Sequence, residues 1–62
     1  MDDKTLREVE YIIIRPECEP RAVQIDAYLG DLHLGQRTYY ASSVANAKSE
    51  ARSRIKRLGS LN

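Results

Sequence analysis

The chain has 62 residues, and its ten basic and nine acidic groups nearly cancel to a formal net charge of +1. A chain of this length forms at most one domain and buries only about 60% of its unfolded surface. The charge is nevertheless divided: residues 1–31 hold eight acidic and four basic groups, and residues 32–62 hold one and six. Such a division of charge carries information about which partners the chain can bind, but none about its fold.

Composition excludes several classes of protein. The single cysteine, Cys18, cannot form an intramolecular disulfide, which favours a reducing, cytoplasmic setting. The longest apolar run, residues 11–14, is far below the roughly 20 residues that a membrane span requires. The first three residues are Met-Asp-Asp, acidic where a signal peptide would be basic. We therefore expect a cytoplasmic domain with no membrane partner.

The first strand is expected over residues 8–15, which are rich in β-branched side chains. Because residues 11–14 are apolar at both odd and even positions, this strand should be covered, at least partly, on both sides. In a three-stranded meander it would lie at an edge, where an apolar strand invites pairing. Before it, the segment from Thr5 to Glu8 fits a capping box, so either a short helical turn or a coil is expected.

The middle of the chain predicts a hairpin. Apolar and polar residues alternate over residues 22–29, as in a strand with one buried face. Gly30 and Asp31 then interrupt, and glycine at the first central position favours a two-residue turn of type II′.

That turn fixes a register for the two strands. On the core side, Leu29 should face Leu32, Ala27 should face Leu34, and Val23 should face Thr38. On the other side, Tyr28 should face His33, Gln24 should face Arg37, and Ala22 should face Tyr39. The four apolar partners nearest the turn share one face, which agrees with this register.

A helix is expected from Ser42 or Ser43, either of which can act as N-cap, to Gly59, which can act as C-cap. Its apolar stripe is Val44, Ala47, Ala51, Ile55 and Leu58. The sequence therefore predicts an α+β domain over residues 1–62, in which a three-stranded antiparallel meander is followed by one C-terminal helix packed on one face. Residues 1–5 and 59–62 are expected to fray.

No catalytic, metal or cofactor site can be assembled from the residues present. Cys18 lies between Glu17 and Glu19, whose negative charge disfavours the thiolate that a nucleophile needs. His33 is the only histidine, and the paired spacings of a zinc site are missing. The chain is therefore predicted not to be an enzyme.

Two surfaces are candidates for binding. The first is the face of the sheet away from the helix, where Tyr28, His33, Arg37 and Tyr39 would form a protein-binding surface. Alternatively, these residues are present only because they suit a pleated strand.

The second surface is the basic C-terminal helix. Lys48, Arg52 and Lys56 should form a stripe on one side of the apolar face, and Arg54 and Arg57 should lie around the other side. These cations could bind the phosphates of a nucleic acid. Alternatively, these cations form a solvated face, or they compensate the negative charge of the acidic loop at residues 17–19 within the fold.

The order of elements resembles the small toxin-neutralising domain of HicB-type antitoxins. The residues that match are Tyr11-Ile-Ile-Ile-Arg-Pro-Glu17 in the first strand and Ala45-Asn-Ala-Lys-Ser-Glu-Ala51 in the helix. Gly30-Asp31 replaces the family's proline-glycine loop, and no DNA-binding domain is appended. The resemblance implies binding to a partner protein in place of catalysis.

The chain also resembles a double-stranded-RNA-binding domain, which likewise has three strands and then a helix. It lacks room for that domain's first helix, and Ser43-Val-Ala-Asn-Ala-Lys48 lacks the family's adjacent lysine pair. The leading hypothesis is therefore a non-enzymatic regulatory module, of the kind found among phage and plasmid accessory proteins. It would bind a protein partner, or a second copy of itself, through the open sheet face or the edge of the first strand. Nucleic-acid binding is the alternative.

Overall fold

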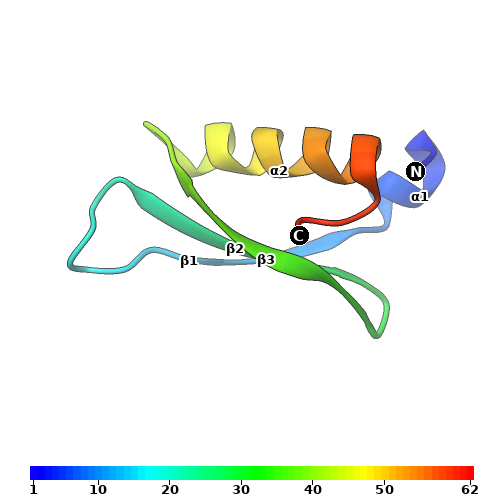
Figure 1. Cartoon of the computed structure of the whole chain (residues 1–62), viewed down its shortest axis with the longest axis horizontal. Coiled ribbons are helices and arrows are strands. Elements are labelled where there is room, and N and C mark those ends of the chain that lie inside the picture. The colour runs from blue at the N-terminus through cyan, green and yellow to red at the C-terminus, as the bar shows by residue number, and fades with distance from the viewer.

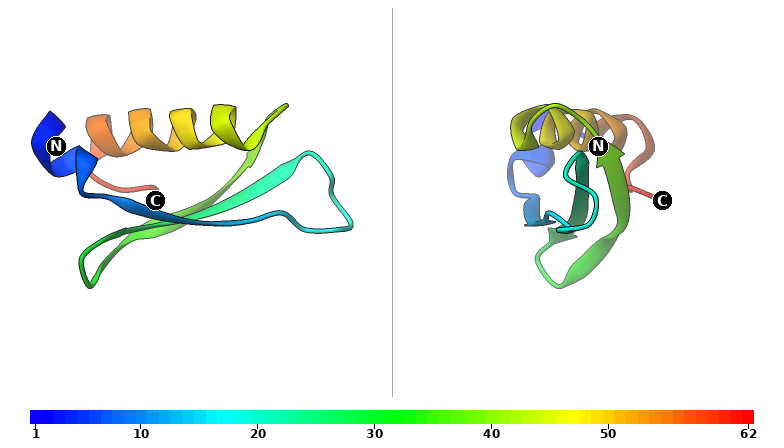
Figure 2. Two further views of the ribbon diagram at one scale, coloured as in Figure 1. Left: turned by 180° about the vertical axis from the view of Figure 1, so that it is seen from behind. Right: turned by 90° about the vertical axis from the view of Figure 1, so that its left-hand side faces the viewer.

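A computed structural model describes all 62 residues. Its elements are α1 (Asp3–Arg7), β1 (Glu10–Ile14), β2 (Ala22–Leu29), β3 (Leu32–Tyr40) and α2 (Val44–Leu58). The strands form one antiparallel sheet in the order β1-β2-β3, and α2 lies along one face of it (Figure 1). The predicted fold, a three-stranded meander with a C-terminal helix on one face, is confirmed. The views in Figure 2 show no helix on the opposite face.

The short helix α1 is attached to the C-terminal end of α2. Asp2 caps α1 by accepting a hydrogen bond of 2.8 Å from the Thr5 backbone N–H, and its hydrogen bonds with Thr5 hold the pKa of Asp2 below its usual value. The helix therefore starts before the Thr5 capping box. The Lys56 ammonium lies 3.1 Å from the Asp3 carboxylate, and the Met1 ammonium donates to the Lys56 carbonyl. These contacts hold the first residues against the body of the domain.

The hairpin turn forms as predicted, but the register behind it changes. Gly30 has a φ of 60°, as the first central position of a type II′ turn requires, and Leu29 pairs with Leu32. Tyr28 also pairs with His33 as expected. Beyond this point a β-bulge shifts β3 by one residue, so that Ala27 lies opposite Gly35, not Leu34.

The bulge moves the rest of β3 to the opposite face. Arg37 pairs with Ile25 and Tyr39 pairs with Val23, which places both on the side covered by α2. The predictions that Arg37 and Tyr39 lie on the outer face beside Tyr28 and His33, and that Val23 faces Thr38, are therefore wrong. Because side chains alternate along a strand, one extra residue reverses every position after it.

The last residues of the chain stabilise the bulge. The N–H of Leu61 donates a hydrogen bond of 2.8 Å to the carbonyl of Leu34, and the Leu61 side chain is fully buried. Gly35 has a φ of 119°, and a Cβ there would lie 2.7 Å from Oδ1 of Asn62. The segment 59–62, which was expected to fray, thus packs against β3.

The core lies between β2 and α2. Its fully buried residues on these two elements are Val23, Ile25, Ala27, Ala47, Ala51 and Ile55. Alanines allow a helix to approach a sheet closely, because they add little volume between the two layers. Leu58, expected to end the apolar stripe, is 53% exposed, and Leu61 occupies the core in its place. Of the two serines that were expected as N-cap, Ser43 caps α2, and Gly59 is the C-cap as predicted.

Candidate functional site

The face of the sheet turned away from α2 is left uncovered by the fold (Figure 2). Its strand residues are Glu10, Ile12, Ile14, Gln24, Asp26, Tyr28, His33, Gln36, Thr38 and Tyr40, according to the pairing register. We call this surface the outer face. Its formal charges are carboxylates, since no lysine or arginine is among these residues.

Two isoleucines give the outer face an apolar strip along β1. Ile12 and Ile14 are 52% and 49% exposed, whereas Tyr11 and Ile13 alternate with them and pack against the core on the α2 side. Cover on both sides of this strand was expected, and the fold supplies it on one side only. The strip also borders a free sheet edge, since β1 pairs with β2 alone.

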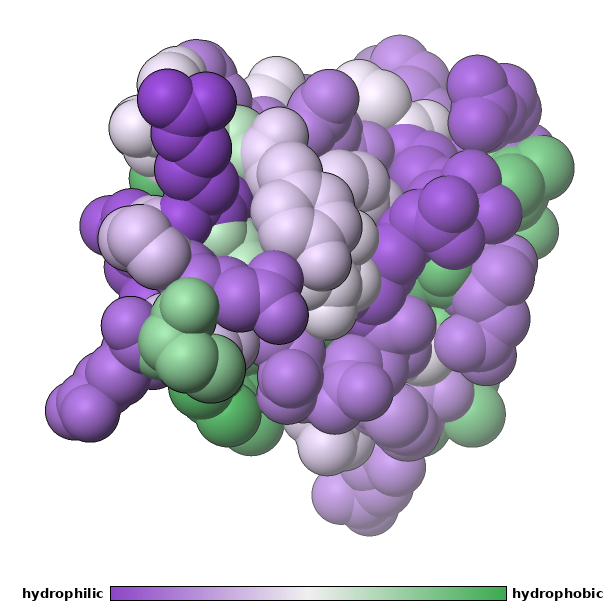
Figure 3. Space-filling model, turned by 60° about the vertical axis from the view of Figure 1, so that its left-hand side comes forward, coloured by the Kyte–Doolittle hydropathy of each residue, from purple (hydrophilic) through white to green (hydrophobic).

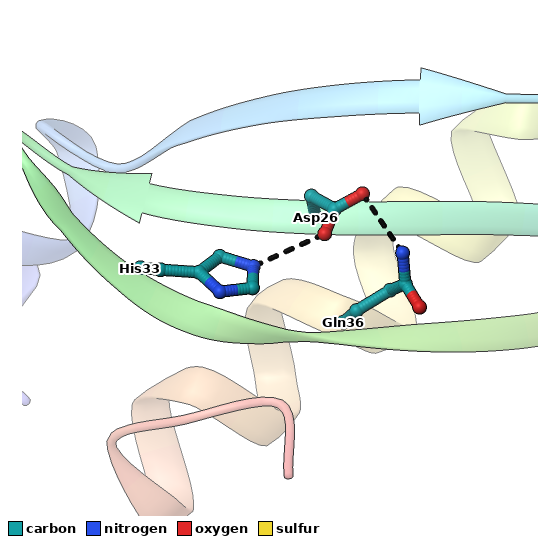
Figure 4. A network of polar contacts seen from close by, with 3 residues as sticks. All are labelled: Asp26, His33 and Gln36. Atoms are coloured by element: carbon teal, nitrogen blue, oxygen red, sulfur yellow. Dashed lines mark hydrogen bonds and ion pairs between the residues drawn. The ribbon is translucent and has the colours of Figure 1, made fainter.

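A polar network occupies the centre of the outer face (Figure 4). One carboxylate oxygen of Asp26 lies 3.0 Å from Nε2 of His33, and the other accepts a hydrogen bond of 3.3 Å from the Gln36 amide. The rings of Tyr28 and His33 stack with centroids 4.8 Å apart. Of the four predicted protein-binding residues, Tyr28 and His33 are therefore neighbours here.

The other two predicted residues, Arg37 and Tyr39, line a groove of about 320 Å³ between β3 and α2. The remaining lining residues all come from α2: Ser49, Glu50, Ser53, Arg54 and Arg57. We call this the β3 groove. It brings together three guanidinium groups from two elements.

The cations of α2 are divided between its two flanks, as the helical spacing predicted. Arg54 and Arg57 line the β3 groove, whereas Lys48 and Arg52 line a second groove beside β1. The Lys48 ammonium lies 5.3 Å from the centre of the Tyr11 ring, within cation–π range. The remaining cation, Lys56, is paired with Asp3 of α1.

Each groove contains a tyrosine whose hydroxyl is buried. The hydroxyl groups of Tyr11 and Tyr39 have no hydrogen-bond partner. Burial raises the pKa of both residues, and nearby arginines, Arg52 for Tyr11 and Arg37 with Arg54 for Tyr39, oppose the rise. A buried hydroxyl without a hydrogen-bond partner costs free energy, so these two groups lower the stability of the folded chain.

Cys18 is exposed in the connection between β1 and β2. No three histidine, cysteine, aspartate or glutamate side chains lie close enough together to hold a metal ion. Neither helix is long and apolar enough to cross a membrane. On the side shown in Figure 3, hydrophilic side chains predominate and hydrophobic ones form small, separate patches.

Comparison with known proteins gave no match to a family model, a curated protein or a solved structure. The site must therefore be interpreted from its own residues. Sequence reasoning missed two features of it: the position of Arg37 in the same groove as the arginines of α2, and the half-exposed strip of Ile12 and Ile14. The continuous apolar run Tyr-Ile-Ile-Ile in β1 could have indicated the strip, because the one long helix can cover only one face of the sheet.

Proposed function

We propose that this chain is a non-enzymatic interaction module that binds another protein through its outer face. The observation that carries the proposal is the strip of Ile12 and Ile14, two large apolar side chains left half-exposed beside a free sheet edge. Single exposed apolar residues are common on protein surfaces. Two that alternate along one edge strand form a continuous anchor for a partner.

The chemistry of the outer face favours a partner that differs from this chain. Around the isoleucines the face presents the carboxylates of Glu10 and Asp26 and no lysine or arginine. Two copies joined through this face would bring like charges together without a compensating cation. A partner with an apolar centre and basic or hydrogen-bond-donating groups around it is complementary.

The size of the expected effect follows from the area that each isoleucine still exposes. Full burial of an isoleucine contributes about 1.5–3 kcal/mol, so covering the exposed half of Ile12 and of Ile14 should contribute about 1 kcal/mol each. Together they account for a factor of roughly thirty in affinity, since 1.4 kcal/mol corresponds to tenfold.

The test begins with capture of partners from the cells that carry the gene, on the immobilised chain. The captured protein is then purified and titrated against three forms of the chain by calorimetry. The double variant I12T/I14T keeps β-branched residues in β1 and should bind at least tenfold more weakly. L58Q alters a side chain of the same exposure on α2 and should bind within twofold of the unaltered chain.

Equal binding by I12T/I14T and the unaltered chain would contradict the proposal, as would a dimer of this chain that I12T/I14T abolishes. Sedimentation of the purified chain distinguishes the second outcome.

Nucleic-acid binding is the second candidate, and the cations on both flanks of α2 favour it. It requires that affinity for a 20-base-pair RNA duplex fall steeply with salt and that K48Q/R52Q reduce both the affinity and the salt slope. Fluorescence anisotropy of a labelled duplex measures both quantities. No binding at low salt would eliminate this candidate.

A further inference from the structure

We infer that the β3 groove binds a phosphate monoester carried on an extended peptide. The groove lies on the α2 side of the sheet, so this site is separate from the outer face and does not depend on the proposed function.

Only one of the three arginine side chains of the groove makes hydrogen bonds within the fold. Arg37 and Arg57 make no hydrogen bond or ion pair through their side chains, and Glu50 is not paired with any of the three arginines. Only Arg54 has partners, the carbonyl oxygens of Leu61 and Asn62. Two guanidinium groups therefore remain available to a ligand.

The charge of the lining matches one phosphate monoester. Three arginines and the single carboxylate of Glu50 give a net charge of +2. A phosphate monoester carries about −1.5 to −2 at neutral pH, and a guanidinium donates to two of its oxygens in parallel. Ser49 and Ser53 add hydroxyl donors on the same wall. A groove of about 320 Å³ is at the lower limit for a ligand pocket, which suits one phosphate group and its side chain.

The tail of the chain makes a backbone contact with this edge of the sheet. Leu61 donates its N–H to the Leu34 carbonyl of β3 and its own carbonyl accepts from Nε of Arg54 at 3.2 Å. Beyond the tail, residues 36–40 of β3 pair with β2 on one side and have no strand on the other. A peptide that continued along this edge would pair with the backbone while its phosphate met Arg37 and Arg57.

A nucleic acid fits the groove less well than a peptide does. Its phosphates recur along a line, whereas Lys48 and Arg52 lie on the other flank of α2. Glu50 within the groove repels any phosphate, but a single phosphate monoester meets this repulsion once, whereas a polynucleotide would bring several phosphates past the carboxylate.

The test uses a labelled nine-residue peptide of alternating valine and serine with a central phosphoserine, measured by fluorescence anisotropy. The same peptide without phosphate should bind at least tenfold more weakly. The variant R37Q/R57Q should weaken binding of the phosphopeptide at least tenfold, and K48Q/R52Q should change it less than twofold. Both variants remove two positive charges, so the comparison separates the site from general attraction. Arg54 is left unchanged because it holds the tail.

Backbone amide shifts confined to residues 36–40 and the lining of α2 would support pairing along the β3 edge. Equal affinity for the two peptides, or equal loss in the two double variants, would overturn the inference. So would a labelled 12-nucleotide DNA that binds more tightly than the phosphopeptide through Arg37 and Arg57. None of these outcomes involves Ile12 or Ile14, so this experiment and the test of the outer face are independent of each other.

Discussion

The two faces of the sheet differ in how far their apolar residues are buried. Under α2, Ile25 and Val23 of β2 are fully buried. On the outer face, Ile12 and Ile14 of β1 remain about half exposed, and Asp26 holds a polar network between them and β3. A single helix can cover only one face of the sheet, so Val23 and Ile25 are buried on the α2 side, whereas the isoleucines of the outer face stay half exposed.

The difference separates residues that the fold needs from residues that it does not. The covered face is completed by the tail, where Leu61 enters the core beyond the end of α2. The isoleucines of the outer face should contribute less to folding than the residues of the covered face, because about half of each side chain stays exposed in the folded chain. Substitutions on the two faces should therefore affect different measurements.

The largest effect on stability is expected from Leu61→Ala. Removing a fully buried leucine should lower the free energy of unfolding by about 3 kcal/mol, a large part of the total for a small domain. Urea denaturation measures the change. The control is Leu58→Ala, three residues earlier and 53% exposed, which should cost less than about 1 kcal/mol. Equal losses in the two variants would show that the tail is not part of the core.

Gly35→Ala should lower stability by about 2 kcal/mol, because alanine is strained at a φ of 119° and its Cβ would meet Asn62. The clash involves the tip of a side chain and can be relieved, whereas the backbone strain cannot. The double variant G35A/N62A should therefore recover only part of the loss in a thermal denaturation experiment. Full recovery would mean that the bulge at Leu34 does not fix the backbone at Gly35.

Removing the unpaired hydroxyls should act in the opposite direction. Tyr11→Phe and Tyr39→Phe should each raise the free energy of unfolding by up to about 1 kcal/mol, since neither loses a hydrogen bond. Tyr28→Phe, on the outer face, is the matched control and should leave stability nearly unchanged. A loss of stability in Y11F or Y39F would indicate that the hydroxyl has a partner in solution.

The same tyrosines predict a dependence of stability on alkaline pH. Burial raises the pKa of Tyr11 and Tyr39 in the folded chain above the value of about 10 that tyrosine has when unfolded. Below pH 10 both states keep these hydroxyls protonated, so the free energy of unfolding does not change with their ionisation. It falls as the pH rises above 10 and through the folded pKa values, because the unfolded chain loses these protons more readily. Denaturation between pH 9 and pH 11.5 should show a smaller decline for Y11F/Y39F than for the unaltered chain.

A small effect on stability is expected from I12T/I14T. Threonine keeps the β-branched shape that suits a strand, and the positions are half-exposed, so the free energy of unfolding should change by less than about 1 kcal/mol. Circular dichroism during urea denaturation measures it. A loss as large as that of Leu61→Ala would place these isoleucines among the residues that hold the fold together.

Local signals in the sequence were sufficient for the three strands, for α2 and for the hairpin turn, but not for α1, where a helical turn and a coil were both expected. Gly30 requires a positive φ, Ser43 caps α2, and alternation identifies β2, because each depends on neighbouring residues alone. The same reasoning placed Tyr28 opposite His33, and it divided the helical cations correctly between the two flanks of α2.

The bulge and the tail could not be predicted in this way. The extra residue at Leu34 is favoured by a contact with Leu61, 27 positions away, and by the space that Gly35 leaves for Asn62. Gly35 within the third strand was the available sign, since an isolated glycine in a strand often marks a bulge or a close approach of backbone. Without the bulge, Arg37 and Tyr39 were assigned to the wrong face, and the β3 groove was not foreseen.

The most direct test of the interaction module is the accessibility of its isoleucine methyl groups to a soluble paramagnetic agent, measured by NMR with and without the purified partner. In the free chain, the methyl signals of Ile12 and Ile14 should broaden strongly, and those of Ile25 and Ile55 should not. With the partner bound, Ile12 and Ile14 should become protected. If they remain broadened in the complex, or are already protected in the free chain, the outer face is not the binding surface.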